Sequence, residues 1–243
     1  MKDCVIITGG TRGIGLTTAL KYANDKVHMI LTYKSNLKAS SNAKNKIKKH
    51  FSNFSIIKCN PSNKNDLNKL SKLIKKNKFN VKTLINNQGS TKYINKKNSA
   101  LNIHLFQEMI EKNLFNHIKM INLVLPFMKK GSSIINVSSI AAINGKGSNI
   151  GYCAAKSALD SVTRSLTHLL APKVRVNSVC PGLTTTDMTK KAPKKYKKNQ
   201  ISITPMKRLA EPEDIANAIY SISELNTFIS GQSIIVDGGR LLN

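Results

Sequence analysis

The stretch Val5-Ile6-Ile7-Thr8-Gly9-Gly10-Thr11-Arg12-Gly13-Ile14-Gly15 decides the fold of this chain. It passes from a short β-rich segment through a glycine turn into a helical pattern. Gly9, Gly13 and Gly15 permit a tight turn and let backbone N–H groups approach a pyrophosphate, to which the helix N-terminus adds a partial positive charge. The spacing is Gly-x-x-x-Gly-x-Gly, not the better known Gly-x-Gly-x-x-Gly, so the position between a strand and a helix carries the prediction of a dinucleotide site.

Short apolar strand patterns alternate with helical patterns along the rest of the chain. The strands are expected at residues 5–8, 27–32, 55–57, 81–85, 133–137, 174–179 and 234–236. The helices are expected at residues 14–22, 37–50, 67–74, 101–128 and 151–170. This alternation is typical of a parallel sheet covered by helices on both faces. With no repeat and no linker-like change of composition, the sequence predicts one α/β domain over residues 1–243, a doubly wound (Rossmann) sheet of seven parallel strands.

The composition limits the class of protein. A chain of 243 residues that is 40% hydrophobic is long enough to bury a sizeable core and too apolar for wholesale disorder. No apolar run approaches the roughly 18 residues of a membrane span. The apolar stretch at residues 5–7 is too short for a signal peptide. We therefore expect a cytoplasmic protein with no membrane partner.

Neither the cysteines nor the histidines have the spacing of a metal site. The cysteines form no Cys-x-x-Cys pair, which excludes a zinc ribbon, and their separation argues against a disulfide framework: Cys4, Cys59, Cys153 and Cys180. The histidines show no ligand spacing either: His28, His50, His104, His117 and His168. We expect no metal, and we expect Cys153 to be a small packed residue because no histidine lies near it in the sequence.

The strong positive charge raises nucleic acid as a partner, but the residue types argue against it. The chain carries 39 Lys+Arg against 12 Asp+Glu, a formal net charge of +27. Only five of the basic residues are arginine, the side chain whose bidentate fork reads bases, and no Trp is available for stacking on them. We therefore expect most lysines to lie on a solvated surface, with no nucleic-acid partner.

The absence of acidic residues after the second strand bears on the cofactor. A site for NAD usually places a carboxylate about 20 residues past the glycines, where it binds the ribose 2′-hydroxyl. This chain has no Asp or Glu between Asp25 and Asp66. Instead, Arg12 lies in the glycine turn and Tyr33-Lys34-Ser35 follows the second strand. Both cations would favour the negative charge of a 2′-phosphate, so the sequence predicts NADP(H).

A tyrosine, a lysine and a serine are the candidates for the chemistry. Tyr152 and Lys156 are spaced i and i+4, so both project from one face of a helix. A free phenol has a pKa of about 10, and a nearby lysine cation would lower that pKa toward the range useful for acid–base catalysis. Ser139 follows the fifth strand, at the carboxyl edge of the sheet where ligands of such folds bind.

Together these features resemble the short-chain dehydrogenase/reductase family, nearly from end to end. The matching motifs are Thr8–Gly15, Asn86-Asn87-Gln88-Gly89, Asn113, the set Ser139, Tyr152 and Lys156, Pro181-Gly182, and Thr186-Asp187-Met188. The ending is similar to that of the 3-oxoacyl-(acyl-carrier-protein) reductase branch. It comprises Arg208-Leu209-Ala210-Glu211-Pro212-Glu213-Asp214, Gly231-Gln232 and Val236-Asp237-Gly238-Gly239.

The resemblance implies a mechanism in which NADPH delivers hydride to a substrate carbonyl. Tyr152 would protonate the developing alkoxide, and Ser139 would orient that oxygen. Lys156 would lower the pKa of Tyr152 and hold the nicotinamide ribose, while Asn113 would support a water that relays protons to Lys156. The cofactor-binding residues implied by the motifs and the resemblance are Gly9, Thr11, Arg12, Gly13, Ile14, Gly15, Tyr33, Lys34, Ser35, Asn60, Asn87, Gly89, Tyr152, Lys156, Pro181, Gly182 and Thr184.

The chain departs from the family pattern at two positions. Gln88 replaces the usual small residue of Asn-Asn-Ala-Gly, and its longer amide would narrow the pocket or add a hydrogen bond. Asn60 replaces the aspartate that commonly contacts adenine, and we expect altered affinity with binding retained.

The substrate is expected to be anionic or carried by an anionic partner. By resemblance, a lid at about residues 184–207 covers the substrate site, and residues 189–199 carry six lysines and no acid. Lys129 and Lys130 are expected near the same rim. An acyl carrier protein, a phosphopantetheine arm or coenzyme A would be attracted to it. These features favour a β-ketoacyl thioester of fatty-acid or polyketide synthesis as the substrate.

Two alternatives stay open at this stage. The chain could instead act on another small ketone, a sugar or a polyol. It could also be a non-catalytic dinucleotide-binding or nucleic-acid-binding module, although the intact set of candidate catalytic residues argues against that. The resemblance further implies a homotetramer or homodimer.

Overall fold

The computed structural model describes residues 2–24, 27–93, 102–190 and 192–242. Within these ranges seven strands form one parallel sheet in the order β3-β2-β1-β4-β5-β6-β7. The strands are β1 (Lys2–Ile7), β2 (His28–Tyr33), β3 (Phe54–Lys58), β4 (Phe79–Asn86), β5 (Ser132–Val137), β6 (Val174–Pro181) and β7 (Ser233–Val236). The doubly wound parallel sheet predicted from the sequence is confirmed, and each predicted strand is found.

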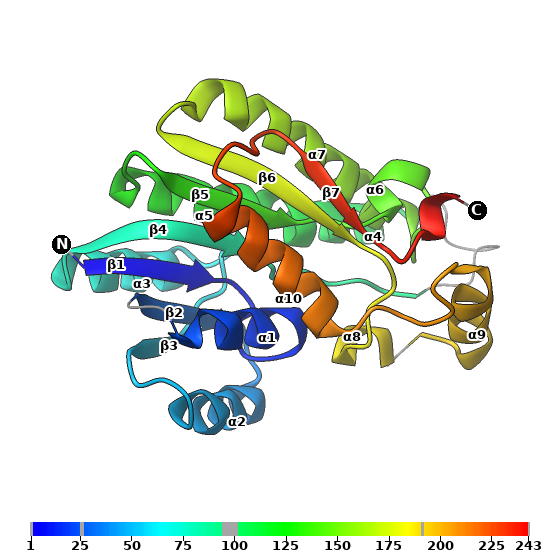
Figure 1. The fold of residues 1–243 in the computed structure, drawn as a ribbon, viewed down its shortest axis with the longest axis horizontal. Coiled ribbons are helices and arrows are strands. Elements are labelled where there is room, and N and C mark those ends of the chain that lie inside the picture. Colours follow the sequence, from blue (N-terminus) through cyan, green and yellow to red (C-terminus); the bar gives the residue numbers. More distant parts are fainter. Residues whose placement is uncertain (1, 25–26, 94–101, 191, 243) are drawn as a thin grey trace.

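The order of the strands reverses beside β1, and this reversal positions the candidate site. The chain runs outward from β1 through β2 to β3, and then returns to place β4 on the other side of β1. The carboxyl ends of the strands share one edge, and α8 (Asp187–Lys190) and α9 (Lys194–Ile203) lie beyond that edge in Figure 1. Open α/β sheets bind ligands at such a switch point, at the carboxyl ends of the strands.

Helices cover both faces of the sheet, as predicted. Val5 and Ile7 of β1 belong to one apolar core and Cys4 and Ile6 to the other, because alternate residues of a strand point to opposite faces. The first core also contains side chains of α1 (Gly13–Lys21), α2 (Leu37–Lys48) and α10 (Pro212–Tyr220). The second contains side chains of α3 (Lys64–Lys76), α5 (Asn116–Val124) and α7 (Ile150–Leu170).

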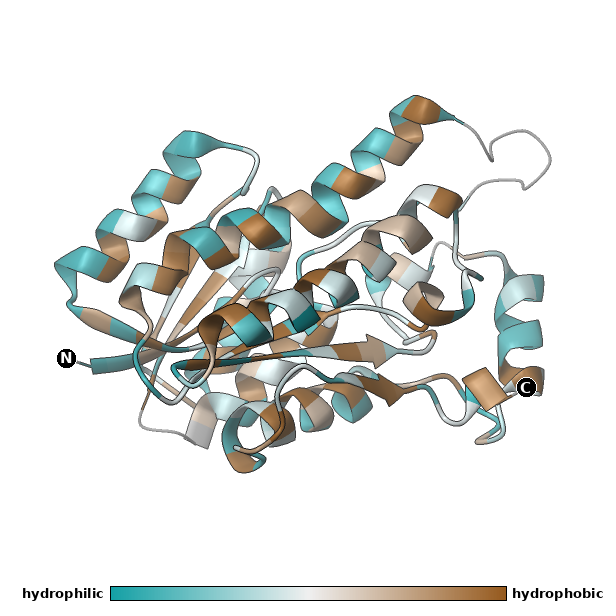
Figure 2. Ribbon diagram, turned by 90° about the horizontal axis from the view of Figure 1, so that it is seen from above, coloured by the Kyte–Doolittle hydropathy of each residue, from teal (hydrophilic) through white to brown (hydrophobic). Residues whose placement is uncertain are grey.

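Figure 2 shows the same arrangement by hydropathy. The hydrophobic colour follows the strands in the middle of the molecule, and the helices around them alternate between hydrophilic and hydrophobic segments, as amphipathic helices do. None of the helices described is long and apolar enough to span a membrane.

One long helical path runs beside the site, with a π-helical turn in its middle. It consists of α4 (Ile103–Ile110), η2 (Glu111–Phe115) and α5, and it ends in the short η3 (Leu125–Phe127). The sequence predicted one helix from residue 101 to 128; residue 101 lies outside the described ranges. Single π-helical turns within α-helices occur often at functional sites, and this one contains Asn113.

The segment between β6 and β7 holds more helices than the sequence analysis predicted. The structure places α8, α9, α10 and the π-helical turn η4 (Ser221–Leu225) there. Three short helical segments lie elsewhere: η1 (Tyr22–Asn24), α6 (Ala141–Asn144) and η5 (Arg240–Leu242). Helices α8 and α9 have no fully buried residue, so they lack the apolar periodicity on which the prediction depended.

Candidate active site

A cavity of about 400 Å³ opens at the carboxyl edge of the sheet. It brings together all four candidate catalytic residues, which come from η2, the end of β5 and α7. It also gathers most of the predicted cofactor residues: Gly9, Thr11, Arg12, Gly13, Ile14, Tyr33, Lys34, Ser35, Asn87, Gly89, Tyr152, Lys156, Pro181, Gly182 and Thr184. Gly15 and Asn60 are not among its lining residues.

The glycine turn is built for close approach. A Cβ atom on Gly15 would lie 2.5 Å from the carbonyl oxygen of Gly9, so no larger residue fits between α1 and the turn. Gly15 thus contributes to the site by letting α1 pack closely against the turn. Arg12 is the N-cap residue of α1, and its side chain makes no capping hydrogen bond. Among the described residues no side-chain hydrogen bond caps α1, so its first backbone N–H groups, at the wall of the cavity, could bind a pyrophosphate.

Asn87 and Thr8 tie the turn to the end of β4. The Asn87 side-chain amide donates to the carbonyl oxygens of Thr8, at 2.9 Å, and Gly9, at 3.2 Å. In return, the Thr8 hydroxyl oxygen accepts the backbone N–H groups of Asn87 and Gln88 at 2.9 and 3.0 Å. The Asn87 amide thus supports the shape of the site. Thr8, which the site prediction omitted, is its partner.

The end of the cavity beside β2 is positively charged. Lys34 lines the cavity there together with Tyr33 and Ser35, as predicted. Arg12 also lines the cavity, and its guanidinium lies 3.8 Å from the carboxylate of Asp187 on α8. Both side chains are about half exposed, so this ion pair is weak and leaves Arg12 available to a stronger anion.

The N-terminus of α7 places Tyr152 in the cavity. Asn149 is the N-cap residue, and its side-chain oxygen accepts the backbone N–H of Tyr152 at 2.8 Å. The Asn149 amide also donates to the carbonyl oxygen of Lys92, which ties the cap to the loop after β4. Ser139 lies in the loop after β5 and lines the same cavity, where its hydroxyl acts to lower the pKa of the Tyr152 phenol. The predicted Ser139–Tyr152 pair is therefore brought together.

The expected lowering of the Tyr152 pKa is wrong for the protein without cofactor. Burial raises the pKa of Tyr152 to about 12, and the hydrogen bond from Ser139 opposes this only in part. The Lys156 ammonium lies 5.9 Å from the centre of the Tyr152 ring. It donates instead to the carbonyl oxygen of Val137 at 2.7 Å. Burial also lowers the pKa of Lys156 to about 8, so the lysine itself titrates near neutral pH.

Asn113 joins η2 to the segment that follows β4. Its amide donates to the carbonyl oxygens of Ser90 and Met109, both at 3.0 Å, and its oxygen accepts the backbone N–H of Ser90 at 3.0 Å. A Cβ atom on Gly89 would lie 2.8 Å from that oxygen and 3.8 Å from the Lys156 ammonium. Asn113 and Lys156 thus approach each other across Gly89, where only glycine fits.

The two departures from the family pattern lie in different surroundings. Gln88 lines the cavity, and its side-chain oxygen is buried without a hydrogen-bond partner among the described residues. Asn60 lies beyond β3, outside the cavity lining, where its oxygen faces the backbone N–H of Ser62 at 3.4 Å. Gln88 is therefore positioned to affect a ligand directly.

Two tyrosines that the sequence analysis did not select line the cavity beside α9. Tyr93 follows β4, Tyr196 lies on α9, and their ring centres are 5.9 Å apart. Burial raises the pKa of Tyr93 to about 12, so both phenols stay neutral at physiological pH. The two residues are 103 positions apart and belong to no motif. Only the folded lid brings them together.

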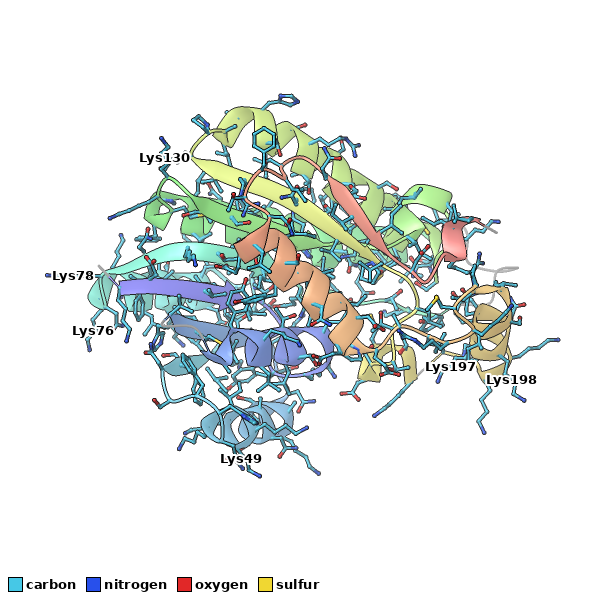
Figure 3. All side chains as sticks on the ribbon, viewed as in Figure 1. Lys49, Lys76, Lys78, Lys130, Lys197 and Lys198 are labelled. Carbon is cyan, nitrogen blue, oxygen red and sulfur yellow. The ribbon has the colours of Figure 1, made fainter. Side chains whose placement is uncertain are left out.

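The expectation that Lys129 and Lys130 lie near the lid is wrong. Both precede β5, at the amino edge of the sheet, whereas the lid lies beyond the carboxyl edge. Figure 3 shows Lys130 at the opposite end of the molecule from Lys197 and Lys198. A residue that directly precedes a parallel strand lies at the amino edge of the sheet. Lys129 and Lys130 therefore lie away from the site, which is at the carboxyl edge. Of the six predicted lid lysines, Lys191 is outside the described residues.

The chain matches known proteins over nearly its whole length. A family model described as Enoyl-(Acyl carrier protein) reductase matches residues 9–240. A 3alpha-hydroxysteroid dehydrogenase of Mediterraneibacter gnavus is 33% identical, over 96% of this chain and 94% of its own. A 3-oxoacyl-(acyl-carrier-protein) reductase of Rickettsia felis is 32% identical, over 98% and 96%. A solved short-chain dehydrogenase/reductase of Brucella melitensis, titled glucose/ribitol dehydrogenase, superposes with a TM-score of 0.88 at 29% identity, over 98% and 96%.

Proposed function

Because the chain belongs to the short-chain dehydrogenase/reductase family, whose members use nicotinamide dinucleotides, we propose that it is an NADPH-dependent carbonyl reductase. Its product is a secondary alcohol. The substrate proposed is a β-ketoacyl thioester on acyl carrier protein, as in fatty-acid or polyketide synthesis. The single observation that carries the reductase proposal is the convergence of Ser139, Tyr152 and Lys156 in the cavity beside the uncapped N-terminus of α1.

The proposed chemistry assigns each side chain to a stated atom. The bound NADPH supplies the hydride to the carbonyl carbon. The Tyr152 hydroxyl donates its proton to the carbonyl oxygen as negative charge develops there, and Ser139 hydrogen-bonds and orients the same oxygen. A neutral phenol is the form that this role requires, and the raised pKa of Tyr152 keeps it protonated at neutral pH.

Lys156 and Asn113 have supporting roles in this proposal. Lys156 would hold the nicotinamide ribose, and its ammonium, 5.9 Å from the centre of the Tyr152 ring, would place positive charge beside the phenol. Asn113 keeps Gly89 and Ser90 in place beside that ammonium, and it supports the water that returns a proton to Lys156.

The choice of NADPH over NADH rests on Arg12 and Lys34. Both line the end of the cavity beside β2, and the sequence around Lys34 holds no carboxylate between Asp25 and Asp66. A 2′-phosphate bound there would be attracted by both cations and repelled by no acidic side chain of this stretch. The 2′-hydroxyl of NADH, in contrast, would lack its usual carboxylate acceptor.

The proposal for the substrate rests on the relatives and on the lid. One relative is named as a 3-oxoacyl-(acyl-carrier-protein) reductase, and the lysines of residues 189–199 would attract an acidic carrier protein. Residues 184–207 form the lid of what we take to be one domain over residues 1–243. We further propose a homotetramer or homodimer, located in the cytoplasm. Relatives named as a hydroxysteroid dehydrogenase and a glucose/ribitol dehydrogenase keep another ketone, a sugar or a polyol as the second candidate substrate.

The experiment that tests this function is NADPH oxidation measured side by side with β-ketoacyl thioesters, simple ketones and sugars. We expect the acyl thioesters to have the highest kcat/KM, with a further gain on acyl carrier protein that falls with salt. A kcat/KM for the acyl thioesters that is no higher than that for unrelated ketones would overturn the substrate assignment. No oxidation with any carbonyl would overturn the reductase assignment and leave a dinucleotide-binding module.

A further inference from the structure

A second cavity, of about 270 Å³, adjoins the candidate active site on the lid side. Tyr196 and Gln200 of α9 line both cavities, as do Ile140, which precedes α6, and Lys146 and Gly147, which follow it. The two spaces therefore share one wall. In the binding mode proposed below, a substrate whose carbonyl lies against Tyr152 extends past Tyr196 into the second cavity.

The lining of the second cavity is polar and positively charged. None of its lining residues is a carboxylate. Five of them carry an amide or a positive charge: Asn144, Lys146, Asn199, Gln200 and Arg240. Within the described part of the chain, no carboxylate oxygen lies within 4.0 Å of the Lys146 ammonium. The cavity thus offers positive charge and hydrogen-bond donors next to the place where a carbonyl would react.

Lys146 is held on a fixed loop beside Tyr152. Its backbone N–H donates to the Asn144 side-chain oxygen at 2.9 Å. The preceding residue, Gly145, accepts a hydrogen bond from the Cys153 thiol at 3.3 Å. The following residue, Gly147, is packed so closely that a Cβ atom there would lie 2.6 Å from the Cys153 sulfur and 3.3 Å from the Tyr152 ring. The buried Cys153 therefore anchors this loop.

Arg240 reaches the cavity from the opposite side. It begins η5, after β7, and its Nε donates to the side-chain oxygen of Gln200 at 3.4 Å. Its positive charge partly opposes the effect of burial on the pKa of Tyr196. Lys146 and Arg240 thus border the same space from two segments that are 94 residues apart in the sequence.

We propose that this cavity is an anion subsite, and that the substrate carries a carboxylate or phosphate group remote from its reacting carbonyl. Lys146 and Arg240 would bind that group through charge-assisted hydrogen bonds, with amide donors from Asn144, Asn199 and Gln200. The inference rests on the proposed reductase function for its use of the neighbouring carbonyl site. It differs from the general attraction of the lid lysines because it depends on two named cations.

Two matched pairs of ketones test the subsite. The first pair is acetoacetyl-4′-phosphopantetheine and acetoacetyl-pantetheine, which differ by a phosphate. The second is 4-oxopentanoate and its methyl ester, which differ by a carboxylate charge. We expect kcat/KM of the wild-type enzyme to favour the anionic member by about tenfold, in keeping with one charge-assisted hydrogen bond. Because the phosphate lies much further from the ketone than the carboxylate does, the pair with the larger ratio shows which combination of group and distance the subsite accepts.

Charge-matched variants separate the subsite from the overall charge of the protein. Lys146→Met is expected to lower the ratio of kcat/KM between the anionic and the neutral ketone of a pair about tenfold. Arg240→Gln is expected to lower the same ratio. Lys130→Met removes the same charge at the far edge of the sheet, and it should leave the ratio unchanged. A wild-type ratio near one, or a ratio that Lys146→Met and Lys130→Met lower equally, would overturn the subsite.

A binding measurement keeps this test separate from the test of the reductase function. In calorimetric titrations of the full chain, 4-oxopentanoate should bind about tenfold more tightly than its methyl ester, and Lys146→Met should remove the difference. Tight binding without turnover would overturn the reductase proposal and support the subsite. Turnover of neutral ketones, with equal binding of acid and ester, would overturn the subsite and support the reductase proposal.

Discussion

The ammonium group of Lys156 donates a hydrogen bond of 2.7 Å to the main-chain carbonyl oxygen of Val137. Val137 is the last residue of β5, and Lys156 lies on α7, so the bond ties the catalytic helix to the sheet. The bond holds the cation back from the Tyr152 phenol, and burial of the charged group lowers the Lys156 pKa to about 8. The protein thus keeps a buried cation at a cost in stability.

Replacing Lys156 by methionine is expected to stabilise the cofactor-free protein at pH 7 while removing activity. The fall of the Lys156 pKa from 10.5 to about 8 corresponds to a cost of about 3 kcal/mol for the charged form. Losing the hydrogen bond to Val137 reduces the gain by about 1 kcal/mol, which leaves a net gain of about 2 kcal/mol. Denaturant unfolding of both proteins at pH 7 measures this difference.

The pH dependence of that difference has a definite sign. Below pH 8 Lys156 is protonated in both the folded and the unfolded wild-type chain, so the folded protein bears the full cost of burying the charged group. Between pH 8 and 10.5 the unfolded chain holds the proton and the folded protein releases it, so wild-type stability rises relative to the variant. The advantage of Lys156→Met should therefore vanish near about pH 9.5, and by pH 10.5 the variant should be the less stable protein by about 1 kcal/mol. An advantage independent of pH would contradict the buried cation.

Capping of α7 is expected to matter for catalysis as well as for stability. Asn149→Ala removes the acceptor of the Tyr152 backbone N–H and should cost about 1 kcal/mol of unfolding free energy. Because Tyr152 lies in that first turn, kcat should fall as well. Asn63→Ala is the matched control, since Asn63 caps α3 and does not line the cavity, so the variant should cost similar stability with no change in kcat. Equal kcat in both variants would contradict the role of the cap.

A methyl group on Gly89 is expected to impair the site through Asn113. In Gly89→Ala the new Cβ would lie 2.8 Å from the Asn113 side-chain oxygen, a distance that forces one of the two segments to move. We expect a loss of about 1–3 kcal/mol in unfolding free energy, the usual cost of overpacking, and a fall in kcat. Gly131→Ala is not a suitable control, because Gly131 has a φ of +91°. Asn63→Ala again supplies the comparison of stability loss without loss of turnover.

Cofactor preference is expected to follow Arg12 and Lys34. Arg12→Ala and Lys34→Ala should each raise the Kd of NADPH about tenfold, the effect of losing one charge-assisted contact, and leave that of NADH nearly unchanged. Nucleotide fluorescence titration at constant ionic strength measures both constants. Lys130→Met controls for the loss of one positive charge. An equal weakening of NADPH and NADH in Arg12→Ala would contradict recognition of the 2′-phosphate.

The sequence was sufficient for the fold and for most of the candidate site. The strand–turn–helix of residues 5–15 and the alternation after it determined a doubly wound sheet. In such a sheet, residues that follow strands meet at the carboxyl edge. This rule placed Ser139, Asn87 and Pro181 at the cavity. The same rule, applied to Lys129 and Lys130, would have corrected the expectation that they border the lid.

The rest depended on tertiary contacts that have no local signal. Tyr93 and Tyr196 meet only because α9 folds over the end of the sheet, and Lys146 and Arg240 border one cavity from distant segments. Helix α10 had a readable signal that the prediction missed, with Pro212 in its first turn and a capping box between Glu211 and Asp214. Predicting the pKa of Tyr152 requires knowing how deeply its side chain is buried, and no spacing in the sequence gives that.

The measurement that tests the central claim most directly compares wild type with Tyr152→Phe in steady-state NADPH oxidation with a β-ketoacyl thioester. The substitution removes only the phenolic oxygen, so the Kd of NADPH should stay within about twofold while kcat falls by a factor of about 100 or more, the usual contribution of a general acid. A variant that binds NADPH and oxidises it at the wild-type rate would contradict the assignment of Tyr152 as the proton donor.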